Sequence, residues 1–249
     1  DPLGVVTRTE YDNAARPFRT TRNYVNAGPV DHQTNVATTT EYDAAGRMVA
    51  TIDPLGRRTV YRYDLAGRQY EVIRNYDDGD PTTGDTDSDL ITRTAYDEKG
   101  RAIATIQNYV DGLWNPAAPD TDNKTVTEYD DLDRPVKTIA HYVDGVSSGG
   151  EPDTDLIGET LYDAAGNVVA TIDPLGRVTV TAYDALNRPT STTRNCTDGG
   201  GVPRTSACDS GHGAGNDENL RTETHYNTRG LVLYTLDVLG RTTDYGHDR

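Results

Sequence analysis

The sequence is poor in the side chains that fill an ordinary globular core. Its 249 residues include one Phe, one Trp and one Met beside 16 Tyr, and only 34% are hydrophobic. Tyrosine favours strands and keeps one polar end. With little to bury, such a chain depends on ladder hydrogen bonds and on cross-strand pairs, each contributing about 0.2–1 kcal/mol. The composition therefore favours a repetitive β-sheet over a compact globule.

Positive charge and long apolar runs are also scarce. There are 24 Lys and Arg against 40 Asp and Glu, which gives a formal net charge of −16. This charge would repel a phosphate backbone, so nucleic acid is not an expected partner, and neither is an anionic membrane surface. No segment reaches the roughly 20 apolar residues that span a bilayer, so we expect no membrane insertion.

The only two cysteines, Cys196 and Cys208, lie in one loop-like segment without zinc-type neighbours. A local disulfide is favoured over two free thiols, which exposed loops usually avoid. A disulfide implies an oxidising compartment, so we expect the protein to be secreted or at the cell surface. Because the chain starts at Asp1 rather than Met, we interpret it as a processed product or an excerpt of something longer.

A tandem repeat dominates the sequence. The segment Thr40-Glu41-Tyr42-Asp43-Ala44-Ala45-Gly46-Arg47 recurs in variants along the whole chain. The spacings between successive repeat tyrosines are 31, 21, 33, 33, 33, 21, 43 and 19 residues. The nine repeat heads are Tyr11, Tyr42, Tyr63, Tyr96, Tyr129, Tyr162, Tyr183, Tyr226 and Tyr245. We predict one continuous array over residues 1–249.

Each unit has the pattern of a β-hairpin. An alternating run such as 59–63 precedes the Tyr, which indicates a strand. The following Asp, small residues and Gly are typical of a turn. A second strand follows, and short units close with Asp53-Pro54-Leu55-Gly56 or its equivalent at Asp173. We expect the Asp to close the turn and the Tyr to stack on its counterpart one unit away.

These motifs resemble the YD repeats of the Rhs family, which includes bacterial Rhs proteins, toxin-complex shells and teneurins. The matching residues are Tyr42-Asp43-Ala44-Ala45-Gly46-Arg47 with Asp53-Pro54-Leu55-Gly56, and Tyr162-Asp163-Ala164-Ala165-Gly166-Asn167 with Asp173-Pro174-Leu175-Gly176-Arg177. The resemblance implies a long sheet that spirals into a hollow shell, often around a passenger polypeptide. Neither the self-cleaving segment typical of Rhs cores nor a passenger is found in this sequence.

Longer units replace the Asp-Pro-Leu-Gly turn with acidic insertions whose acids align. Oxygen ligands beside a Gly-containing turn suit Ca²⁺. Solvated acids that cap turns and keep sheet edges soluble fit the same pattern. The possible calcium ligands are Asp78, Asp87, Asp89, Asp111, Asp120, Asp122, Asp144, Asp153 and Asp155. No other cofactor is expected.

No catalytic constellation emerges from the residues. Asp209-Ser210-Gly211 matches a short aspartic-protease motif, but such an enzyme needs two copies and the chain has one. The five histidines form no spaced metal pair. We therefore expect no enzyme. Trp114 is a possible glycan platform or a loop anchor, and Asn123 and Asn195 begin glycosylation sequons.

The sequence thus predicts an all-β fold of tandem antiparallel hairpins in a continuous spiral sheet, as a shell, tube or fibre segment. The predicted function is extracellular and structural. Its partners would be copies of itself or flanking repeats, joined by strand pairing. One alternative is an adhesive or glycan-binding surface on the insertion loops, and another is the wall of a toxin-enclosing Rhs shell.

Overall fold

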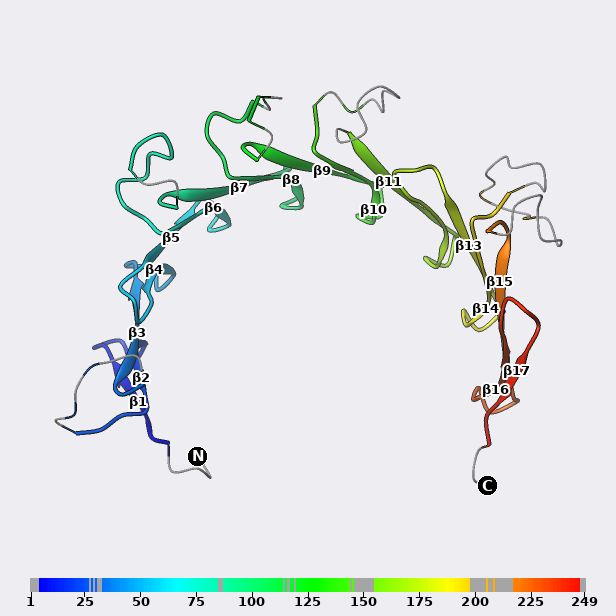
Figure 1. Cartoon of the computed structure of the whole chain (residues 1–249), viewed down its shortest axis with the longest axis horizontal. Helices are drawn as coiled ribbons and strands as arrows, with labels where there is room; N and C mark the ends of the chain where they lie inside the picture. Colours follow the sequence, from blue (N-terminus) through cyan, green and yellow to red (C-terminus); the bar gives the residue numbers. More distant parts are fainter. Residues whose placement is uncertain are drawn as a thin grey trace. The chain divides into compact units, whose positions relative to one another are not determined.

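The protein is composed of strands, turns and loops (Figure 1). The computed structural model describes residues 5–26, 28, 30, 33–84, 87–113, 115, 117, 118, 120–143, 145, 155–197, 205, 208 and 217–246. Within these ranges there is no helix, and hence none of the length and apolarity that a membrane span requires. The chain divides into two compact units, Asp1–Val126 and Thr127–Arg249.

Unit 1 is a run of antiparallel hairpins in which each strand pairs with the next along the chain. Its strands are β1 (Thr7–Tyr11), β2 (Pro17–Arg22), β3 (Val36–Tyr42), β4 (Met48–Ile52), β5 (Arg58–Tyr63), β6 (Gln69–Arg74), β7 (Leu90–Tyr96) and β8 (Ala102–Gln107). The strand β9 (Asn123–Tyr129) begins in unit 1 and ends in unit 2.

Unit 2 repeats this pattern from β10 to β17. Its strands are β10 (Pro135–Ala140), β11 (Leu156–Tyr162), β12 (Val168–Ile172), β13 (Val178–Tyr183), β14 (Pro189–Arg194), β15 (Leu220–Tyr226), β16 (Val232–Leu236) and β17 (Thr242–Asp244). The predicted tandem antiparallel hairpins are confirmed. The first eight repeat tyrosines each end a strand, and Tyr245 directly follows β17.

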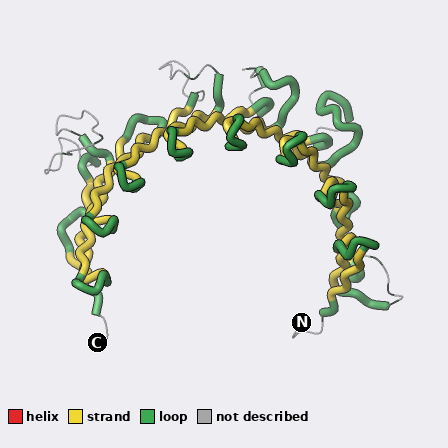
Figure 2. The backbone as a smooth tube through the Cα atoms, turned by 180° about the vertical axis from the view of Figure 1, so that it is seen from behind, coloured by secondary structure: helices red, strands yellow, loops and turns green. Residues whose placement is uncertain are grey.

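Each unit has two rims of different composition. Odd strands lead into even strands through the short Tyr-Asp turns, which form the head rim. Even strands lead into odd strands through the Asp-Pro-Leu-Gly turns or the insertions, which form the loop rim. Figure 2 shows these turns and loops in green between the yellow strands. The two kinds of connection therefore never share a rim within a unit.

The two faces of the sheet differ because side chains alternate along a strand. One face carries the small apolar core, in which Ala50, Ile73, Ile91 and Ile139 are buried. Insertions cover this face: a Cβ placed on Gly145 would lie 3.7 Å from Cδ1 of Ile139. The opposite face carries rows of paired threonines, such as Thr171 between Thr160 and Thr179. We call it the threonine face.

Candidate functional site: the joint between repeats

At seven heads the residue after the repeat tyrosine is Asp, which organises the turn through both of its carboxylate oxygens. In the second repeat, Oδ1 of Asp43 accepts the backbone N–H of Arg47 at 2.8 Å, and Oδ2 accepts its Nε at 2.7 Å. The backbone N–H of Asp43 donates to the Arg47 carbonyl at 2.9 Å. Gly46 adopts φ +84°, a left-handed conformation that glycine tolerates best. These bonds fix the position of the arginine side chain as well as the path of the backbone through the turn.

This fixed arginine reaches the next repeat. In the joint from the first repeat to the second, the Arg16 guanidinium lies 4.6 Å from the ring centroid of Tyr42. Its Nη1 also donates to the carbonyl of Asp43 at 3.1 Å. The same ring contact recurs at Arg47 with Tyr63, Arg68 with Tyr96, Arg134 with Tyr162 and Arg188 with Tyr226.

The repeat tyrosine completes the joint in the reverse direction. The Tyr96 hydroxyl donates to the backbone carbonyl of Gln69 in the preceding repeat at 2.7 Å. Tyr42, Tyr63, Tyr162, Tyr183 and Tyr226 make the equivalent bond. Tyr-on-Tyr stacking was the wrong expectation, because in these joints the ring receives an arginine of the preceding repeat. The Asp, Arg and Tyr therefore form one lock between neighbouring hairpins.

One joint lacks the arginine of the lock. Asn167 stands where six other heads have Arg, and its Nδ2 still donates to Oδ2 of Asp163 at 2.8 Å. The following Tyr183 retains its hydroxyl bond to the Val168 carbonyl at 3.0 Å. The turn and the tyrosine bond thus persist without the cation–π contact, which contributes about 0.5–1 kcal/mol at exposed sites.

Because of these locks, the stability of the fold should decrease at acidic pH. Hydrogen bonds from the backbone and then from the side chain of Arg47 hold the pKa of the Asp43 carboxyl below its usual value. The pKa is also lowered at Asp12, Asp64, Asp97, Asp130, Asp163 and Asp184. A lowered pKa in the folded state adds stability above the unfolded pKa, which is lost as the pH falls through the folded value.

We therefore expect the melting temperature to hold between about pH 7 and pH 5 and to fall below about pH 4, near the ordinary aspartate pKa. Thermal unfolding followed by circular dichroism over this pH series measures the effect. Protonation also relieves the repulsion of a net charge of −16. A melting temperature that rises continuously as the pH falls to about 3 would show that this relief outweighs the locks.

In each 33-residue repeat, the last aligned acid is buried inside the insertion and holds the loop together. Asp89 is 1% exposed. Its carboxylate accepts the backbone N–H groups of Asp77 at 3.1 Å, Asp78 at 3.2 Å and Gly79 at 3.0 Å. Asp122 and Asp155 do the same in their loops, and Asn35 and Asn219 take this place in the first and last insertions. The sequence showed the alignment of these acids but not this role.

The other aligned acids are distributed differently. The carboxylates of Asp78 and Asp111 accept local bonds from Asp80 and Leu113. Asp87 and Asp120 are exposed and lend their backbone carbonyls to Asn75 and Asn108. Asp144 and Asp153 lie outside the described residues, as does Trp114. Within the described ranges, no three His, Cys, Asp or Glu side chains gather as a metal site requires. Calcium binding stays a prediction, which a chelator titration of the melting temperature tests.

The predicted disulfide is present in the structure. Cys196 and Cys208 are joined by an S–S bond of 2.01 Å, and Cys196 is fully buried against Ala170 and Val178. Cys196 follows the left-handed Asn195 as Tyr76 follows Asn75, so the disulfide stands where other insertions begin with tyrosine. The sequon residue Asn195 donates its Nδ2 to the Asp217 carbonyl at 2.9 Å. Asn123 lies in β9 rather than in a loop.

Comparison with known proteins gives one family and several solved structures. The model of the RHS Repeat family matches residues 42–81 and 162–200. No curated protein matches the chain in sequence. The solved structure of TcdB2-TccC3 is 16% identical with a TM-score of 0.40, and the match covers 94% of this chain and 15% of that one.

Two further solved structures show comparable similarity. TcdB2-TccC3-TEV is 16% identical with a TM-score of 0.39, covering 97% of this chain and 14% of that one. The Photorhabdus luminescens Tc holotoxin pore is 14% identical with a TM-score of 0.31, covering 96% and 14%. The chain thus spans a small part of the length of these proteins. The two segments matched by the family model each begin at a repeat tyrosine, Tyr42 and Tyr162, so the chain contains RHS repeats in these two segments.

Proposed function

We propose that the chain is an extracellular structural element, a stretch of wall in a shell, stalk or fibre. The repeating lock carries this proposal. A complete lock joins one hairpin to the next through an ion pair, a ring contact and a tyrosine hydrogen bond, and it forms across short turns and insertions alike. The disulfide supports an oxidising compartment. A thin sheet with a small apolar core suits a wall better than a catalytic globule.

The proposed partners are further strands. Within the described residues, β1 pairs only with β2, and β17 pairs only with β16. Strand edges carry unpaired backbone groups that recruit other strands. We propose that copies of this chain, or flanking repeats of a longer one, pair there.

Light scattering of the purified chain tests this pairing. We expect assemblies whose mass exceeds the 27.1 kDa of one chain and rises with concentration. The backbone N–H of Tyr245 faces β16, where it bonds the Leu233 carbonyl, so the N–H of Asp244 faces outward. Asp244→Pro removes that outward donor and should reduce the assembly, whereas Asp244→Asn keeps it. A monomer at every concentration would contradict the proposal.

Two other functions are separate proposals. A toxin-enclosing wall is consistent with the Rhs-repeat family, and electron microscopy of the native protein would show it as a closed hollow particle. A glycan-binding surface is favoured by a polar cleft on the threonine face of unit 2.

A further inference from the structure

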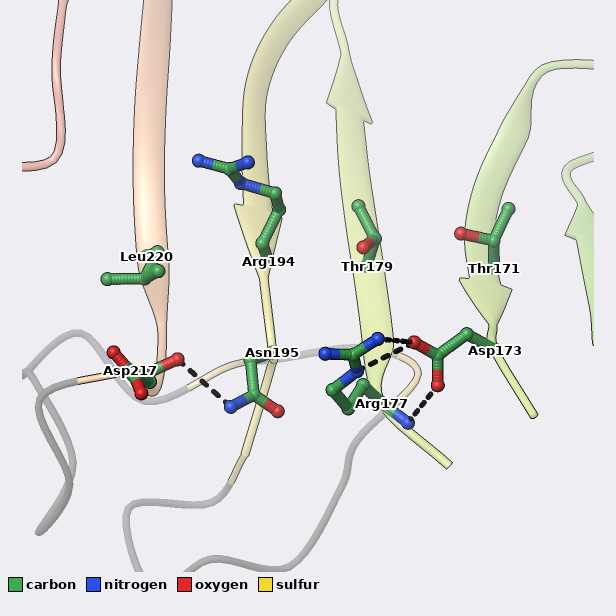
Figure 3. A pocket seen from close by; sticks show the side chains of 8 residues that line it. All are labelled: Thr171, Asp173, Arg177, Thr179, Arg194, Asn195, Asp217 and Leu220. Atoms are coloured by element: carbon green, nitrogen blue, oxygen red, sulfur yellow. Dashed lines mark hydrogen bonds and ion pairs between the residues drawn. The ribbon is translucent and has the colours of Figure 1, made fainter. Parts of the chain in front are cut away.

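Unit 2 contains a polar cleft on the threonine face, beside the Asp173–Arg177 turn. Its volume is about 430 Å³. Four neighbouring strands, β12 to β15, contribute side chains to it, and Figure 3 shows them in a row. The lining includes Thr171, Thr179, Arg194, Asn195 and Asp217.

Within the part of the chain that the structure describes, the guanidinium of Arg194 has no partner. Among the described residues, only four arginine side chains make no ion pair, hydrogen bond or ring contact: Arg22, Arg74, Arg194 and Arg229. Three of these occupy one repeat position, the last residue of an even strand on the threonine face. In a chain with a net charge of −16, unpaired cations at one recurring position are unexpected unless they meet something else.

The position of this arginine correlates with the turn that faces it. Three hairpin repeats open with Asp-Pro-Leu-Gly and end with an Arg-Asn pair. These pairs are Arg22-Asn23, Arg74-Asn75 and Arg194-Asn195. The two repeats that lie between two insertions, with heads Tyr96 and Tyr129, instead have Gln107 and Ala140 at this position. The arginine therefore accompanies the turn, although the turn's own aspartate pairs with Arg177 and not with it. This co-occurrence indicates that turn and arginine together line a site.

We propose that this cleft binds a hydroxylated carboxylate, such as a uronic-acid unit of an acidic polysaccharide. The planar guanidinium of Arg194 matches a carboxylate with two parallel hydrogen bonds. The hydroxyls of Thr171 and Thr179 lie on the same face and suit the hydroxyls of a sugar ring. The Asp217 carboxylate, toward the opposite end of the cleft in Figure 3, accepts from further hydroxyls. The Asp173–Arg177 pair adds no net charge.

Unit 1 repeats part of this arrangement. A hollow of about 260 Å³ beside the Asp53–Arg57 turn is lined by Arg57, Asn75 and Asp87, which correspond to Arg177, Asn195 and Asp217. The unpaired Arg74 ends the adjacent strand β6, at the position of Arg194 in β14. We expect a second, weaker site there, because its hollow is smaller.

Residue-resolved NMR titration tests the proposal with three probes at low salt: sodium glucuronate, glucose and acetate. We expect saturable shifts around Thr179 and Arg194 with glucuronate, and weaker responses to glucose or acetate. Arg194→Gln should lower the affinity of this site about tenfold, the usual loss for a charge-assisted bond. The substitution is compatible with the fold, since Gln107 occupies the same position in another unit.

Arg229→Gln is the matched control, because Arg229 is the one unpaired arginine of the head rim among the described residues. It should leave the affinity unchanged, and both variants should keep the wild-type melting temperature. An equal response to glucose and glucuronate would overturn the proposal. So would an unchanged affinity in Arg194→Gln, or an equal loss in Arg229→Gln, which would indicate general charge attraction.

Discussion

Replacing Asp89 with Ala should lower the free energy of unfolding by about 3 kcal/mol, because the change strands several buried backbone donors. The carboxylate is 1% exposed and accepts three backbone N–H groups, from Asp77, Asp78 and Gly79. Alanine offers no acceptor, and the loop that covers the sheet loses its central contact. Urea unfolding followed by circular dichroism would measure the change.

Asp89→Asn is the matched control, because asparagine occupies the equivalent position in the first and last insertions. The Asn35 side-chain oxygen accepts the Val25 N–H at 2.9 Å, and that of Asn219 accepts the Thr197 N–H at 2.8 Å. We expect the Asp89→Asn variant to retain most of the stability. If chelation of wild-type protein produced the same loss as Asp89→Ala, the carboxylate would be serving calcium instead of backbone donors.

Replacing Glu71 with Ala should cost about 3 kcal/mol through the loss of a buried carboxylate between two arginines. Glu71 is 1% exposed, with Arg62 Nη1 at 2.7 Å from Oε1 and Arg93 Nε at 2.6 Å from Oε2. It thus connects β5, β6 and β7 on the core face. The two arginine side chains are 43% and 39% exposed, so they can turn to water and the cost stays near the lower end of the range for broken buried pairs.

Glu10→Ala serves as the exposed counterpart. Glu10 also contacts two arginines, Arg8 at 3.2 Å and Arg19 at 3.9 Å, but its side chain is 31% exposed. Surface ion pairs contribute about 0–1 kcal/mol. Thermal unfolding of both variants should therefore separate them clearly. Equal losses would mean that burial does not strengthen the Glu71 contacts.

The hairpins were predictable from sequence because their signals are local. In each unit the alternating run, the Asp and the left-handed position lie within about ten residues, which is the range over which turn chemistry acts. The disulfide was likewise predictable, because Cys196 and Cys208 have no other partner of their kind. The arginine at six of the heads was visible as a recurring residue in the sequence.

The joint and the loop closure were not predictable in the same way. Arg188 stacks on Tyr226, 38 residues further along the chain, while Arg47 stacks on Tyr63, only 16 residues away. Because the insertions vary in length, such partners do not recur at a fixed spacing in the sequence. Aligned acids such as Asp89 fit a metal site and a loop closure equally well as a pattern. Only the positions of the backbone N–H groups distinguish the two.

The separation of the two rims has a consequence for how such a chain can be altered. The locks belong to the head turns, whereas all variation in unit length occurs on the other rim. An insertion can therefore be shortened, exchanged or grafted from another unit without changing the register of any joint. In this respect the array is modular: one rim preserves the architecture, and the other is free to diversify.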